Sequence, residues 1–181
     1  WDHTDGLIKI KEETGCKVIG PIEKSKPIIG LDKMVDEGDQ INFGGQIIEI
    51  LHTPGHTLDM INFYLPNEGA VFTGDTLFTL GCGRVFEGSK EMMWESLQKL
   101  KQLPPETVLY SSHEYTLANI KFALSADPQN QKLFERSEML KAKRANNEPT
   151  VPSMLGDELA TNPFLRPDNQ QIRAHLGMEH A

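Results

Sequence analysis

Four short segments of the sequence combine histidine with carboxylate side chains. They are Asp2-His3, Thr53-Pro54-Gly55-His56-Thr57, Thr73-Gly74-Asp75-Thr76 and Ser112-His113-Glu114-Tyr115. Imidazole and carboxylate groups are the ligands that zinc, iron and manganese accept in proteins. A lone histidine is more often a surface or packed residue, and a lone Gly-Asp is more often a turn. The four segments together, each at the end of an expected strand, instead favour a metal site.

Ligands on loops can converge when a rigid sheet holds the loops in place. The expected strands are 17–19, 40–43, 46–52, 60–65, 70–73 and 107–110, and the expected helices are 4–15, 89–102, 116–126, 130–146 and 168–176. Gly44-Gly45 has the pattern of a two-residue hairpin turn between two of these strands. His52, at the end of one of them, is interpreted as a polar strand-end residue and not as a ligand.

The helix boundaries rest on capping residues. Thr4 and Asp5 offer capping oxygens to the first helix. Ser89 is expected to cap the helix that ends at Gln102, whose apolar positions are Met92, Met93, Leu97 and Leu100. Gly15 suits the C-terminal end of the first helix.

Strands and helices alternate up to Tyr115, whereas only helices are expected after it. This pattern is typical of a layered α/β arrangement followed by a helical part. We therefore predict an α/β domain over residues 1–115 and a small α-helical domain over residues 116–181.

Composition narrows the class of partner. The chain has 181 residues and a net charge of −8, which opposes a nucleic-acid partner because binding to a polyanion depends on Lys and Arg. No apolar run approaches the roughly 20 residues of a membrane span, so we expect no membrane and a small-molecule partner. Cys16 and Cys82 stand far apart, which favours ordinary thiols in a reducing cytoplasm.

The four segments, in this order and spacing, resemble the metallo-β-lactamase superfamily. Its first motif ends in Asp-His, and a His, a bridging Asp and a final His follow. The resemblance implies an αββα sandwich with its N-terminal part missing and a catalytic role for Asp2 and Asp75. It also implies two divalent metal ions in the complete protein, with zinc as the first choice and iron or manganese as alternatives. The implied metal ligands are Asp2, His3, His56, Asp75 and His113. The two histidines that open the motif are absent, and so is a short helix that the resemblance implies beyond Ala181. We therefore expect a chain truncated at both ends.

Within the superfamily, the sequence is similar to the glyoxalase II family. Residues 81–88 resemble that family's glutathione-binding loop, and residues 148–153 and 162–166 resemble parts of its C-terminal helical domain. The resemblance implies substrate contacts from Arg84, Phe86, His113 and Tyr115. Tyr115 is equally well interpreted as an aromatic anchor at the domain junction. Phe86 stands where the family usually has Tyr, which removes a hydroxyl group.

The resemblance implies hydrolysis of the S-lactoylglutathione thioester to glutathione and D-lactate, the second step of methylglyoxal detoxification, by a cytoplasmic monomer. The nucleophile would be a hydroxide held by two metal ions, since a metal lowers the pKa of bound water to about 7. Two alternatives remain. One is another enzyme of the superfamily, such as a persulfide dioxygenase, a lactonase or a β-lactamase. The other is a fragment that is inert or only binds metal, because the two histidines that would complete the binding of one ion are absent from the sequence.

Overall fold

A mixed six-stranded sheet carries three of the four candidate segments at the ends of its strands. The computed structural model describes residues 2–23 and 27–179, and the sheet order is β10-β9-β6-β5-β4-β3. In chain order its strands are β3 (Gln40–Phe43), β4 (Gln46–His52), β5 (Ile61–Leu65), β6 (Ala70–Gly74), β9 (Val108–Ser111) and β10 (Ser153–Met154). Neighbours are antiparallel except β6 and β9, which run parallel with Gly74 opposite Ser111. This pair brings the segment that begins at Asp75 next to the segment that begins at Ser112.

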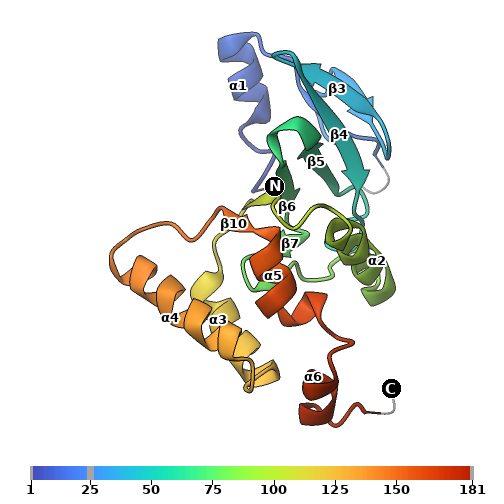
Figure 1. Ribbon diagram of the computed structural model, residues 1–181. Helices are drawn as coiled ribbons and strands as arrows, with labels where there is room; N and C mark the ends of the chain where they lie inside the picture. Colours follow the sequence, from blue (N-terminus) through green and yellow to red (C-terminus); the bar gives the residue numbers. More distant parts are fainter. Residues whose placement is uncertain (1, 24–26, 180–181) are drawn as a thin grey trace.

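The N-terminal part forms a small unit beside the sheet (Figure 1). Helix α1 (Leu7–Thr14) precedes the parallel strands β1 (Ile19–Pro21) and β2 (Lys33–Val35). Lys11 Nζ lies 2.7 Å from Asp32 Oδ1, and the other carboxylate oxygen of Asp32 accepts from the backbone N–H of Val18 at 2.8 Å. The hydrogen bond from Lys11 is the main cause that lowers the pKa of Asp32. These contacts hold α1 against the strands that follow it.

Helix α2 (Lys90–Lys101) packs on the sheet and forms the main core with it. The Ser89 hydroxyl accepts from the N–H of Met92, the expected N-cap interaction. The buried members of this core are Tyr64, Val71, Leu77, Met93, Leu97, Leu100, Leu109, Leu155 and Leu165. Leu155 and Leu165 come from the C-terminal part of the chain, so the core joins the sheet to that part.

The helices of the C-terminal part follow β9 (Figure 1). They are α3 (Thr116–Ala126), α4 (Gln131–Ala145), α5 (Leu155–Thr161) and α6 (Gln170–His175), with one turn of 3₁₀ helix at Pro163–Leu165. A second core lies between α3 and α4 and contains Leu80, Ile120, Ala123, Leu133 and Leu140. Leu80 belongs to the segment between β7 (Leu77–Phe78) and β8 (Gly81–Cys82), so this segment reaches from the sheet into the helical part.

The structure confirms an α/β fold followed by helices, and the hairpin at Gly44-Gly45. The expected capping of α1 is wrong: Gly6 is the N-cap, no side chain caps it, and Thr4 supplies its backbone carbonyl to Leu7 instead. The first strand lies at 19–21 and not at 17–19. Met92 is 40% exposed and lies outside the core.

The domain division near Tyr115 stays a prediction, and β10 from the C-terminal side pairs with β9. Within the described residues, no helix has the length and apolar character required to cross a membrane.

Candidate metal centre and substrate loop

Asp75 stands at the centre of the site. It follows β6 directly, through Gly74, whose φ of +50° is one that glycine adopts without strain. Its carboxylate Oδ2 lies 3.1 Å from the Nε2 atoms of both His3 and His56, and its Oδ1 lies 3.5 Å from Nε2 of His113. The side chain is only 6% exposed. One buried carboxylate therefore faces three imidazole rings that come from three separate segments.

Asp2 adds a second carboxylate to the same group. Its Oδ2 lies 3.5 Å from Nε2 of His113 and 3.7 Å from Nε2 of His3, and these two ring nitrogens are 3.3 Å apart. The ligand atoms of Asp2, His3 and His113 all lie within 4.8 Å of one another. The structure thus brings together all five side chains that the sequence proposes as metal ligands. Their donor set, imidazole nitrogen with carboxylate oxygen, fits zinc, iron or manganese.

The His56 ring is held by the loop that follows β8. Its Nδ1–H donates to the backbone carbonyl of Arg84 at 2.8 Å, because a carbonyl oxygen can only accept. This hydrogen bond leaves the lone pair of Nε2 directed at Asp75. An outer hydrogen bond of this kind fixes the tautomer and the orientation of histidines that bind metals.

Gly83 allows the same loop to lie directly on the Asp75 segment. A Cβ atom at Gly83 would stand 1.8 Å from the carbonyl oxygen of Asp75, a distance that no side chain tolerates. The Gly83 N–H donates to the carbonyl of Thr76 at 3.2 Å. A residue other than glycine would push the loop away from the candidate centre.

Exposed aromatic rings surround the donors. Tyr115 is 52% exposed and stacks on the His113 ring at 5.3 Å, while its ring also meets Phe78 edge-on at 5.5 Å. Phe86 is 68% exposed, and its ring centre lies 4.9 Å from that of His56. Arg84 is exposed on the same loop. The contacts of the Tyr115 ring with His113 and Phe78 fit an aromatic anchor. Its exposure fits a substrate contact equally well.

Sequence reasoning missed Ser112, whose hydroxyl donates to Oδ1 of Asp75. In the sequence, only the position of Ser112 next to His113 points to a role in the site. The other histidines make different contacts: His52 Nε2 donates to the carbonyl of Leu58 at 2.9 Å, and His175 Nε2 donates to that of Ser125 at 2.9 Å. His180 lies outside the described residues.

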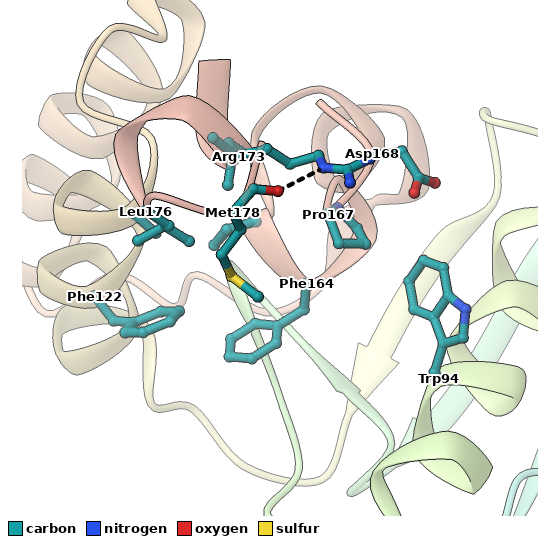
Figure 2. A pocket seen from close by; sticks show the side chains of 11 residues that line it. Trp94, Phe122, Phe164, Pro167, Asp168, Arg173, Leu176 and Met178 are labelled. Atoms are coloured by element: carbon teal, nitrogen blue, oxygen red, sulfur yellow. Dashed lines mark hydrogen bonds between the residues drawn. The ribbon is translucent and has the colours of Figure 1, made fainter. Parts of the chain in front are cut away.

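One hollow borders the donors, and another lies among the C-terminal helices. One, of about 550 Å³, includes Asp2 and His3 in its lining. The other, of about 480 Å³, is apolar and is lined by C-terminal residues and Trp94. In Figure 2 the rings of Phe122 and Phe164 lie stacked along it, 5.1 Å apart. None of the five donors lines the apolar hollow.

The comparisons with known proteins agree with this arrangement. Residues 1–113 match the family model of the metallo-beta-lactamase superfamily, and residues 114–181 match the model of the hydroxyacylglutathione hydrolase C-terminus. The chain is 49% identical over 180 residues to the hydroxyacylglutathione hydrolase of Hyphomonas neptunium, and the match covers 99% of this chain and 70% of the relative. The corresponding protein of a Chelativorans species is 48% identical over 180 residues, covering 99% and 71%.

A solved structure, ETHE1 from Myxococcus xanthus, has a TM-score of 0.66 and 25% identity, covering 97% of this chain and 62% of that one. This likeness agrees with the metallo-beta-lactamase fold that the family model over residues 1–113 shows. With the family models and the relatives, it shows that the chain belongs to the hydroxyacylglutathione hydrolase family of the metallo-beta-lactamase superfamily.

Proposed function

We propose that this protein hydrolyses the thioester of 2-hydroxyacylglutathiones, S-lactoylglutathione above all, to glutathione and a 2-hydroxy acid, D-lactate in that case. The observation that carries the proposal is the convergence of three imidazoles and two carboxylates around buried Asp75. The relatives that match nearly the whole chain are hydroxyacylglutathione hydrolases, which supports the choice of substrate.

The five donors would contribute to the binding of two divalent ions. Asp2, His3 and His113 would serve one ion, His56 would serve the other, and Asp75 would be shared by both. Zinc is our first choice, with iron or manganese as alternatives, because these donors suit all three. When bound, such ions would lower the pKa of water to about 7 and so provide a nucleophile near neutral pH.

The protein groups around the donors have separate tasks. Ser112 orients the Asp75 carboxylate by donating to Oδ1. Arg84 would pair with a carboxylate of glutathione, since a guanidinium recognises that group through two parallel hydrogen bonds. The exposed rings of Phe86 and Tyr115 would flank the acyl-glutathione. The leaving thiolate needs little help from an acid, because a thiol with a pKa near 8.5 leaves readily.

We also propose that the protein acts as a monomer in the cytoplasm. The two cysteines, one exposed and one half-buried, are free thiols in the structure, as is usual in a reducing compartment.

Hydrolysis of S-lactoylglutathione by the full chain, loaded in turn with zinc, iron or manganese, tests the proposed function. We expect turnover that a chelator abolishes and added metal restores. Two results would contradict it. Binding of metal without turnover would favour the fragment that only binds metal, and turnover of a persulfide, a lactone or a β-lactam in its place would favour another enzyme of the superfamily.

A further inference from the structure

The turn between β7 and β8 is held by side chains of the C-terminal helices. Asn119 Nδ2, on α3, donates to the carbonyl of Thr79 at 2.9 Å. The Leu80 N–H donates to Oε2 of Glu158, on α5, at 2.8 Å. Asn162 Nδ2 lies 3.0 Å from the carbonyl of Gly81 and 3.3 Å from that of Phe78. The backbone of this turn is therefore bound at four successive residues by three side chains distant in sequence.

These side chains are themselves fixed. Glu158 is fully buried and pairs with Arg136 of α4, which is 8% exposed. Asn162 is also fully buried, and its Nδ2 reaches Oε2 of Glu158 at 3.1 Å. We call Asn119, Glu158 and Asn162 the turn clamp.

The turn has a backbone conformation that needs such support. Leu80 has a φ of +58°, in the left-handed region that side chains other than glycine rarely adopt, and it is fully buried in the core between α3 and α4. A residue keeps such a conformation only when its surroundings determine it. The clamp and the packing of Leu80 provide those surroundings.

A short stretch of chain connects the turn to the candidate metal donors. A Cβ atom at Gly81 would lie 2.5 Å from Asn119 Nδ2, so the Gly81 backbone rests against that side chain. Two residues later, Gly83 lies against the Asp75 carbonyl. The next residue, Arg84, provides the carbonyl that accepts from His56 Nδ1.

We propose that the turn clamp positions the Arg84 carbonyl and thereby sets the tautomer and orientation of the His56 ring. Asn119, Glu158 and Asn162 are positioning residues in this scheme, since the hydrogen bonds that connect them to the site end on the backbone of the turn. The C-terminal helices would then act on the metal donors. The inference rests on the proposed function only in the role that it gives to His56.

Asn119→Ala is the first variant to test. Asn119 is half-buried on a helix, where alanine is well tolerated. Asn162→Ala is the second variant, because Asn162 is fully buried and its replacement is more apt to disturb folding. Asn146→Ala, at the exposed C-terminal end of α4, is the matched control. Circular dichroism and thermal unfolding set a temperature at which each variant is folded.

The first readout is the His56 tautomer in the metal-free full chain, measured by long-range ¹H–¹⁵N NMR and assigned with His56→Gln. We expect wild type and Asn146→Ala to carry the proton on Nδ1, and Asn119→Ala to show both tautomers. The second readout is hydrolysis by the metal-loaded chain, where kcat/KM of Asn119→Ala should fall about tenfold, as for other lost outer hydrogen bonds.

If folded Asn119→Ala keeps the wild-type tautomer of His56 and the wild-type kcat/KM, the proposal that the turn clamp positions the Arg84 carbonyl is wrong. If wild type itself fails to hydrolyse the thioester, the proposed function fails, and the tautomer comparison still decides the clamp.

Discussion

Among the five donors, Asp75 and Asp2 have very different surroundings. The Asp75 side chain is 6% exposed, and that of Asp2 is 45% exposed. A buried carboxylate is costly to ionise unless hydrogen bonds or cations compensate it. At Asp75 the Ser112 hydroxyl donates to Oδ1, and a metal ion held between the carboxylate and the nearby imidazoles would supply further compensation. The burial makes Asp75 the donor whose position is best defined.

Ser112→Ala should weaken metal binding about tenfold, because the Asp75 carboxylate loses a donor that orients it. Competition with a chromophoric chelator measures the affinity. Ser125→Ala is the matched control, since that hydroxyl is exposed on α3 and donates to its own helix. Equal metal affinities of Ser112→Ala and Ser125→Ala would show that Ser112 does not support the metal centre.

Arg84→Ala should raise KM and leave kcat nearly unchanged, because the guanidinium binds the substrate and takes no part in the reaction. A lost hydrogen bond to a charged group costs about 1.5 to 3 kcal/mol, which corresponds to a rise in KM of about 10- to 150-fold. Steady-state kinetics with S-lactoylglutathione measure both constants. A fall in kcat at constant KM would instead assign Arg84 to the transition state.

At the scale of elements, the sequence predicted those features that depend on residues adjacent in the chain. The Gly44-Gly45 hairpin and the Ser89 cap are set by residues adjacent in sequence, and the metal motifs are local as well. The strands β7 and β8 have two residues each, too few to show an alternating pattern. The turn clamp joins residues about 40 to 80 positions apart, so only the tertiary fold reveals it.

The β7–β8 pair also protects a thiol. Burial raises the pKa of Cys82 to about 12, from an ordinary value of 9.0, whereas Cys16 is exposed. At pH 8 only about one Cys82 in ten thousand would be a thiolate, the form that reacts. Iodoacetamide at pH 8 should therefore modify Cys16 in the native protein and both cysteines after denaturation, as counted by mass spectrometry. The modification of native Cys82 should increase as the pH rises toward 12, and rapid labelling at pH 8 would contradict its burial.

At the scale of the whole molecule, the candidate centre joins distant parts of the chain. His3 and His113 are 110 residues apart in sequence and have ring nitrogens at 3.3 Å. The C-terminal helices add β10 to the sheet and hold the β7–β8 turn. The centre therefore depends on the fold of the entire chain, which spans about 70% of the length of its curated relatives.

The central claim is that Asp75 holds the metal on which thioester hydrolysis depends. The most direct test compares Asp75→Asn with Asp168→Asn, the same change at an exposed aspartate outside the donor set. Elemental analysis should show that Asp75→Asn loses at least one metal ion per chain relative to wild type, and its kcat/KM should fall by more than about a hundredfold, the upper range for a lost outer partner. Asp168→Asn should match wild type in both measurements. Wild-type metal content together with wild-type turnover in Asp75→Asn would contradict the account.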